Sequence, residues 1–197
     1  MRDYPQPGDR LFILGDLFDY WIGDDDDAPL AATVRDALAT AARRGIRIAI
    51  QRGNRDFLMG RRLMRDCGAT LLPDCYVTNV AGQATLLMHG DLLCTDDSNY
   101  QAMRGQIRSP AFTQQFLSRP IPERRAIADD YRRRSGEATA AKPDAIMDVN
   151  QDAVARHMSR AGVQRLVHGH THRPADHRLS LQGRPAVRHV LADWRPG

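Results

Sequence analysis

Five polar side chains with the chemistry of metal ligands follow short apolar runs in this sequence. Asp16, Asn54 and His89 each stand just after one such run, and His170 and His172 follow a fourth. The runs cover residues 11–14, 46–50, 84–88 and 166–167, and their composition predicts strands. Carboxylate, amide oxygen and imidazole together suit divalent ions such as manganese, iron or zinc. The pattern therefore predicts a metal-assisted hydrolase.

The fold must bring these side chains together for that chemistry to take place. Residues just beyond the carboxyl ends of parallel strands meet in one crevice of an α/β sheet, so we expect all five to converge there. His170 and His172, two residues apart, would point the same way on an extended segment. Taken singly, each residue also has a commoner role. Asp16 would serve as a helix cap or turn residue, Asn54 as a turn former and His89 as a core or loop histidine.

Strand and helix patterns alternate along the chain. Helices are expected at residues 31–44, 57–66 and 152–161, where Gly45, Gly68 and Gly162 mark the ends. Residues 76–80 and 84–88 predict one hairpin, 163–167 a further strand, and 178–192 a second hairpin around Gln182 and Gly183. Alternating strands and helices followed by hairpins predict a layered α/β sandwich.

Composition limits the class of protein. The chain has 197 residues, 42% of them hydrophobic, which is enough for one sizeable core, and we expect a single domain over residues 1–197. Its cysteines, Cys67, Cys75 and Cys94, form no C-x-x-C pair, which favours a reduced cytoplasmic setting. There is no apolar stretch of bilayer length and no signal-peptide core in residues 1–8. The net charge of +4 favours phosphates, nucleic acid or an acidic membrane as partners.

The stretch from about residue 100 to residue 145, called the lid segment below, breaks the alternation. It is helix-prone and cut by Pro110, Pro120 and Pro122. Its arginines are Arg104, Arg108, Arg119, Arg124, Arg125, Arg132, Arg133 and Arg134. Two interpretations stay open. The segment is either a solvated helical insertion, or a lid whose arginines bind phosphate while Phe112, Phe116, Leu117 and Ile121 meet lipid.

Longer motifs around these residues resemble a known family. Gly15–Asp16, Gly53–Asp56 and Gly169–His172 are similar to motifs shared by the calcineurin-like metallophosphoesterases. Narrower runs resemble the hydrolases of UDP-2,3-diacylglucosamine within that family, namely Trp21–Asp24, Cys94–Asp97 and Ile146–Asn150. The resemblance covers nearly the whole chain. It implies a metallophosphoesterase-type β-sandwich flanked by helices, with the lid segment as a helical insertion.

The resemblance also implies a site and a reaction. Two Mn²⁺ ions would be bound, with Asp16 bridging them, Asn54, His89 and His170 completing one site, and His172 serving the other. Arg55 would stabilise phosphoryl charge, and Asp16, Asn54, Arg55, His89 and His170 would be catalytic. The implied substrate-binding residues are Asn54, Arg55, Asp97, Ser135, Thr139, Lys142 and His170. The family cleaves UDP-2,3-diacylglucosamine to UMP and 2,3-diacylglucosamine 1-phosphate in lipid A biosynthesis.

Partners and location follow from the same resemblance. We expect a lipid-linked nucleotide sugar as substrate and an anionic inner-membrane surface as the place of work, reached from the cytoplasm by peripheral attachment. Neither nucleic acid nor an obligate protein partner is expected.

One departure from the family pattern bears on activity. Relatives begin with a strand ending in Asp-x-His, which supplies two ligands to the first metal, and no histidine precedes Asp16 here. We therefore expect a chain truncated at both ends, with only Asp16 and His172 left for that metal. Three hypotheses remain: the lipid A pathway hydrolase, a metallophosphoesterase of broader specificity, and a non-catalytic remnant of the fold.

Overall fold

The computed structural model of the chain describes residues 5–140 and 148–193, and residues 136–140 by their helical backbone alone. The described chain divides into two compact units. The first comprises Met1–Pro73 and Gln106–Thr139, and the second Asp74–Gly105 and Ala140–Gly197. The fold is mixed α/β with two sheets, one in each unit, as the sequence predicts.

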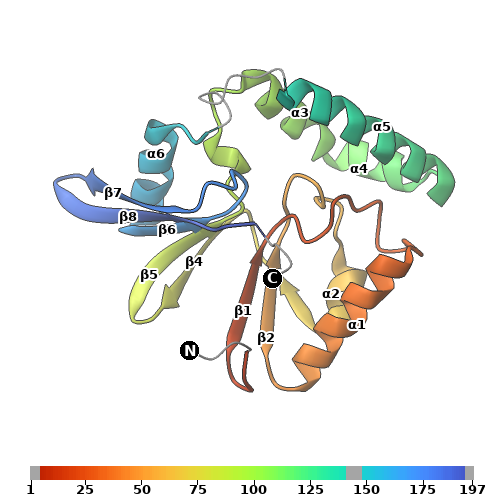
Figure 1. Ribbon diagram of the computed structural model, residues 1–197, viewed down its shortest axis with the longest axis horizontal. Helices are drawn as coiled ribbons and strands as arrows, with labels where there is room; N and C mark the ends of the chain where they lie inside the picture. The colour runs from red at the N-terminus through yellow and green to blue at the C-terminus, as the bar shows by residue number, and fades with distance from the viewer. Residues whose placement is uncertain (1–4, 141–147, 194–197) are drawn as a thin grey trace. The chain divides into compact units, whose positions relative to one another are not determined.

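The first unit contains a parallel three-stranded sheet. Strand β2 (Arg47–Gln51) lies between β1 (Arg10–Leu14) and β3 (Ala69–Leu71). Helices α1 (Pro29–Arg43) and α2 (Arg61–Cys67) pack against each other beside this sheet (Figure 1). Buried Ile48 and Ile50 of β2 join side chains of α2 such as Leu63 in one apolar core. This sheet positions the segments that follow β1 and β2, which carry Asp16 and Asn54.

Helix α2 begins later than its apolar pattern suggests. The predicted start at Phe57 is wrong, because residues 56–60 form a turn in which the Met59 amide donates to the Asp56 carbonyl at 3.0 Å. The Asp24 carboxylate then accepts hydrogen bonds from the amides of Gly60, Arg62 and Leu63 at 2.8–3.0 Å. A side chain more than thirty residues earlier thus supplies the N-terminal cap of α2.

Two helices of the lid segment belong to the first unit. They are α4 (Pro110–Leu117) and α5 (Ile121–Ala140), and α3 (Ser98–Ile107) precedes them. The prolines mark helix starts, as expected, but α5 runs for 20 residues rather than forming a short piece. Phe116 is buried in the core with Phe18 and Trp21, and Phe112 stacks on it with ring centroids 5.9 Å apart.

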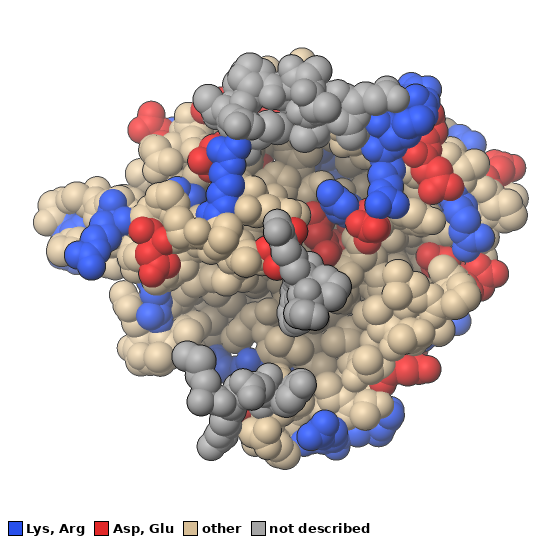
Figure 2. Space-filling model, in the orientation of Figure 1, with Lys and Arg blue, Asp and Glu red and all other residues tan. Residues whose placement is uncertain are grey.

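Buried Arg124 fastens α5 to the segment before α1. Its guanidinium donates to the Ile22 carbonyl at 2.6 Å and to both carboxylate oxygens of Asp25 at 2.8 and 2.5 Å. The partly exposed Arg125 beside it pairs with Asp26 and Asp27. Figure 2 accordingly shows acidic and basic side chains next to one another on the α5 side of this unit. Many lid arginines are therefore engaged by the protein's own carboxylates.

The second unit contains a five-stranded mixed sheet in the order β4-β5-β6-β8-β7. Its strands are β4 (Cys75–Val80), β5 (Gln83–Met88), β6 (Arg165–His168), β7 (Ala175–Leu181) and β8 (Arg184–Val190). Strands β5, β6 and β8 run parallel, and β4 and β7 pair with their neighbours as hairpins. Both predicted hairpins are confirmed. Their turns, Ala81–Gly82 and Gln182–Gly183, have positive φ at both residues, as a two-residue hairpin turn requires.

Helix α6 (Gln151–Ala161) covers one face of this second sheet (Figure 1). Val154 and Met158 of α6 are buried against Leu86 and Leu166 of the central strands. Asn150 caps the helix by accepting from the Ala153 amide, and Gly162 ends it in a left-handed conformation. The core therefore holds β5 and β6 side by side, and these are the strands that lead to His89 and to Gly169–His172.

None of the helices among the described residues is both long and apolar enough to cross a membrane.

Candidate functional site

The segments after β1 and β2 meet closely in the first unit. Asp16 adopts a left-handed conformation (φ 52°), and its carboxylate accepts from the Arg55 amide at 2.9 Å. A Cβ atom on Gly53 would lie 2.0 Å from Asp16 Oδ1 and 2.3 Å from its backbone nitrogen. Only glycine therefore permits this approach. The structure thus brings together Asp16, Arg55 and the backbone that leads into Asn54, as the sequence predicts for this half of the site.

Asp56 holds these two segments in place. It is fully buried, and its carboxylate accepts from the Leu17 amide at 2.8 Å and the Gly53 amide at 2.7 Å. Arg108 of the lid segment adds a bond to the Gly53 carbonyl at 2.7 Å. In the sequence, Asp56 stands out only as the last residue of the Gly53–Asp56 motif. An acidic residue directly after Arg55, in a turn predicted at the end of a strand, was the feature of the sequence that could have indicated this positioning role.

The Arg55 guanidinium lies beside the carboxylates of Asp16 and Asp19. Its Nη1 lies 2.9 Å from Asp19 Oδ1, and its Nε lies 3.7 Å from Asp16 Oδ2. Arg132 of α5 holds the other Asp19 oxygen at 2.9 Å. The guanidinium is about half exposed, so it can reach an incoming anion without leaving Asp19. This placement suits the predicted contact of Arg55 with a phosphoryl group.

The second unit brings His89 and His170 together. His89 follows β5 and is buried, His170 follows β6, and their ring centroids lie 4.9 Å apart with edge-to-face geometry. The Gly169 amide donates to the His89 carbonyl at 2.9 Å, which ties the two segments. Gly90 has φ 126°, and a Cβ atom there would lie 3.1 Å from the His170 Cβ. Close backbone approach again depends on glycine, and the predicted pairing of these histidines is observed.

A hydrogen-bond network that was not predicted from the sequence supports this pair. Asp91 is buried and accepts from Arg104 Nε at 2.7 Å and from the Tyr100 hydroxyl at 3.1 Å. The Tyr100 ring in turn lies against His170, with ring centroids 6.1 Å apart. The available signal was the acidic Asp91 in the run His89-Gly90-Asp91, because carboxylates close to metal ligands often take part in the hydrogen bonds that orient them.

Burial keeps His168 and His170 of this unit neutral. Burial, with the neighbouring His89 as the second cause, lowers the pKa of His170 to about 3. It also lowers the pKa of His168 to about 4. A neutral imidazole retains a lone pair for a metal ion.

His172 does not follow the expected geometry. The prediction that His170 and His172 point the same way on an extended segment is wrong, because both have positive φ, 68° and 53°. Alternation of side chains holds for strands and does not apply to such a turn. His172 Nδ1 lies 3.6 Å from Asp193 Oδ2 instead. Its role as a metal ligand stays a prediction.

The predicted substrate residues of the lid segment have mixed outcomes. Asp97 caps α3 by accepting from the Tyr100 amide at 3.1 Å, and Ser135 is exposed on α5. Lys142 and the Thr139 side chain lie outside the described residues. The expectation that Phe112, Phe116 and Ile121 meet lipid is wrong, because they pack on the core of the first unit; Leu117 is 38% exposed.

The donors in each unit fit a divalent cation. The first unit offers a carboxylate in a cradle that a Cβ would fill, and the second offers the adjacent imidazoles of His89 and His170, with the buried Asp91 network beside His170. Carboxylate oxygen and imidazole nitrogen are the ligands that zinc, manganese and iron share. Arg55 adds a donor for anionic oxygens. Such groups are suited to hydrolysis of a phosphate ester.

Comparison with known proteins agrees with this chemistry. The chain is 49% identical to UDP-2,3-diacylglucosamine hydrolase of Cellvibrio japonicus (strain Ueda107) over 194 residues, which is 98% of this chain and 81% of that protein. It is 48% identical to the hydrolases of the same name from Escherichia coli O139:H28 (strain E24377A / ETEC) and Shigella flexneri over 186 residues, 94% of this chain and 78% of each relative. The calcineurin-like phosphoesterase family matches residues 1–174. A match of this extent, over both pairs of strand-end segments, shows that the chain belongs to the calcineurin-like phosphoesterase family, whose members depend on a divalent metal.

Proposed function

We propose that this protein hydrolyses the pyrophosphate bond of UDP-2,3-diacylglucosamine, giving UMP and 2,3-diacylglucosamine 1-phosphate in lipid A biosynthesis. The observation that carries the proposal is the identity of 48–49% to hydrolases named for this substrate, which extends over at least 94% of the chain. The two strand-end segments of the first unit and the histidine pair of the second support it, because they offer the donors that phosphoester hydrolysis needs.

The proposal assigns the metal ligands as the sequence motifs do. As the family resemblance implies, one Mn²⁺ would be bound by Asp16, Asn54, His89 and His170, and Asp16 and His172 would contribute to another. When bound, such ions supply Lewis-acid activation of water and of the phosphoryl group. Gly53 and Asp56 keep Asp16 in position, and the Asp91 network keeps His170 in position.

Arg55 has a proposed part of its own in the reaction. Asp19 orients its guanidinium, which would donate to the phosphoryl oxygens as their charge develops. Arg55→Ala should therefore lower kcat by about 10²–10³, the cost of one such donor, and change KM less. Arg62→Ala is the matched control, because the exposed Arg62 side chain forms an ion pair with Asp66 of its own helix. We also infer that Lys142→Ala raises KM with kcat retained.

We propose that the enzyme meets its lipid substrate by peripheral attachment to an anionic membrane. Leu117 is exposed on α4, and Ile127 and Tyr131, four residues apart and so on one face of α5, are exposed beside basic residues. Sedimentation with anionic vesicles at low and high salt tests this idea. Binding should weaken with salt and with Ile127→Ser; equal sedimentation of wild type and variant would argue against this face.

The direct test of the reaction is to incubate the protein with UDP-2,3-diacylglucosamine and Mn²⁺, and to identify both phosphate products by ³¹P NMR. Asp16→Asn and His89→Gln should abolish turnover, and Arg62→Ala should retain it. A simple phosphodiester, bis-p-nitrophenyl phosphate, serves as the competing substrate. A higher kcat/KM for this compound would favour the broader-specificity phosphoesterase, and no turnover of either would favour the non-catalytic hypothesis.

A further inference from the structure

A pocket of about 280 Å³ lies wholly within the second unit, on the side of the β7–β8 hairpin. Its polar lining comes from Thr171 and Arg173 after β6, His177 of β7, Arg188 of β8, and Asp148. The volume is slightly below the range of pockets that hold drug-sized ligands, so a small polar ion fits it better. The proposed reaction gives this pocket no part.

The floor of the pocket contains an unusual cation. Arg188 is only 2% exposed, and its Nη1 donates to His168 Nε2 at 3.0 Å. Because Arg188 can only donate, His168 Nε2 accepts, and the His168 Nδ1–H faces the Gly169 carbonyl at 2.8 Å. The hydrogen-bond partner of this guanidinium is therefore a neutral ring, and no carboxylate among the described residues lies within ion-pair distance of Arg188.

Two buried donors on this lining also lack hydrogen-bond partners in the described part of the chain. They are Arg188 Nε and Thr171 Oγ1. Buried donors without partners are rare because each costs the free energy of its lost hydration, and they point to a missing acceptor. Two such donors in the lining of one pocket indicate a ligand that accepts hydrogen bonds.

The charged residues that line the pocket indicate that this ligand is an anion. Arg173 lies at the exposed edge, and its Nη1 is 3.5 Å from Asp148 Oδ2. His177 lies directly opposite Arg188 in the β7–β8 ladder, so both side chains are on the same face of the sheet. Two guanidinium groups against one carboxylate leave the lining with an excess of one positive charge, before any proton on His177 is counted.

We propose that this pocket binds a phosphate-type oxyanion, which accepts hydrogen bonds from Arg188 and Thr171 and pairs with Arg173 at the entrance. Guanidinium and hydroxyl donors around a cavity of this size match tetrahedral oxygens better than the single plane of a carboxylate. The phosphate could be free in solution or belong to a nucleoside monophosphate. The second source rests on the proposed function, in which UMP is a product.

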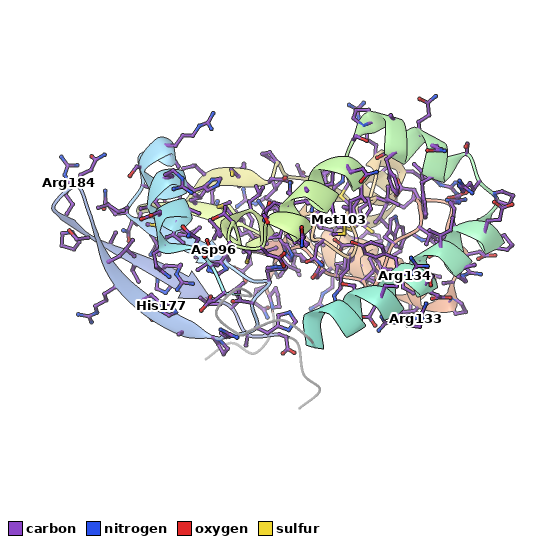
Figure 3. All side chains as sticks on the ribbon, turned by 90° about the horizontal axis from the view of Figure 1, so that it is seen from above. Asp96, Met103, Arg133, Arg134, His177 and Arg184 are labelled. Carbon is purple, nitrogen blue, oxygen red and sulfur yellow. The ribbon has the colours of Figure 1, made fainter. Side chains whose placement is uncertain are left out.

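The test is calorimetric titration of the Mn²⁺-loaded full chain with inorganic phosphate, and separately with UMP, at constant ionic strength. Arg173→Gln, Thr171→Val and Arg188→Lys should each raise the Kd for phosphate about tenfold, the usual effect of losing one charge-assisted bond. Arg184→Gln is the matched control. It removes the same charge from β8 at the hairpin turn, away from His177 in Figure 3.

Each outcome decides the proposal. A UMP affinity above that of phosphate, lost in the pocket variants, identifies the nucleotide as the source, and equal affinities identify free phosphate. Unchanged Kd values in all pocket variants, or no binding by the wild type, would overturn the proposal.

Arg173 is exposed, so its variant keeps the test valid if Arg188→Lys fails to fold. A crystal with Mn²⁺ and phosphate should show the anion against Arg188; an anion at the metal centre alone also overturns the proposal. Turnover of UDP-2,3-diacylglucosamine is a separate readout, so each proposal can fail without the other.

Discussion

The contact of Arg124 with the segment before α1 is open to a quantitative test by the substitution Arg124→Met. Methionine keeps much of the apolar length of the side chain and removes the guanidinium. In the wild type the guanidinium is 3% exposed and donates to the carbonyl of Ile22, a residue that is fully buried. Its second partner, Asp25, is 50% exposed.

The expected loss of stability follows from these three groups. Leaving the Ile22 carbonyl without a donor costs about 1–3 kcal/mol. The pair with half-exposed Asp25 adds up to about 1 kcal/mol, because water can replace Arg124 there. Arg124 Nε has no partner among the described residues, and methionine removes that cost of roughly 1 kcal/mol. With the middle of each range, about 2, 0.5 and 1 kcal/mol, the net loss is about 1.5 kcal/mol, or a Tm lower by roughly 3–6 °C for a chain of this length.

Thermal unfolding followed by circular dichroism measures this shift. Arg134→Met is the control, because Arg134 lies on the same helix, its side chain is 72% exposed, and it pairs with Asp130 of that helix. The hydrogen bond from Arg124 lowers the pKa of Asp25 below 3.8, so the pair contributes stability above that pH and loses it as the pH falls through the lowered value. The difference between wild type and Arg124→Met should therefore narrow below about pH 4. Equal Tm values for the two proteins at neutral pH would refute the assignment of Arg124 as the attachment of α5.

Three further predictions concern the positions that shape the site and the core. Gly53→Ala places a Cβ 2.0 Å from Asp16 Oδ1 and should reduce kcat/KM about a hundredfold, whereas Gly105→Ala, which has open space around it, should not; steady-state kinetics of both variants decide this. Asp24→Ala removes the cap of α2 and should lower the free energy of unfolding by about 1–2 kcal/mol in urea titration, with Asp27→Ala, at a 73% exposed side chain, as the near-neutral control. Iodoacetamide at pH 8 should modify exposed Cys75 alone in the folded protein, because burial raises the pKa of Cys67 to about 11 and that of Cys94 to about 12; early mass-spectrometric labelling of either would contradict their burial.

Much of the fold could be predicted because its signals are local. Apolar runs ended by glycine gave β1, β2, β5 and β6, and two-residue turns gave both hairpins. The residues that follow those strands were predicted to come together. Asp16 does meet the segment after β2, and His89 does meet His170, because strand ends in one sheet share an edge. The short strand β3 (Ala69–Leu71) carried too few residues for a pattern.

The remaining features depend on partners far apart in the sequence. The start of α2 is set by its hydrogen bonds to Asp24. Asp25 holds α5 through its ion pair with Arg124, which is 99 residues away in the sequence. The contact of the lid segment with lipid was predicted only from its local pattern of apolar and basic residues. In the structure, Phe112 and Phe116 pack in the core of the first unit instead. Amphipathic helices look alike in sequence whether their apolar face meets a membrane or a protein core. His172 was misjudged because left-handed residues break the alternation that the prediction assumed.

The most direct test of the proposed metal centre is a crystal structure of the Mn²⁺-loaded protein with anomalous scattering recorded at the manganese edge. The proposal predicts an anomalous peak bonded to Asp16, Asn54, His89 and His170, with that peak and hydrolysis of UDP-2,3-diacylglucosamine both lost in His89→Gln. Manganese bound at other residues, or full activity in a variant that lacks the peak, would contradict the proposed centre.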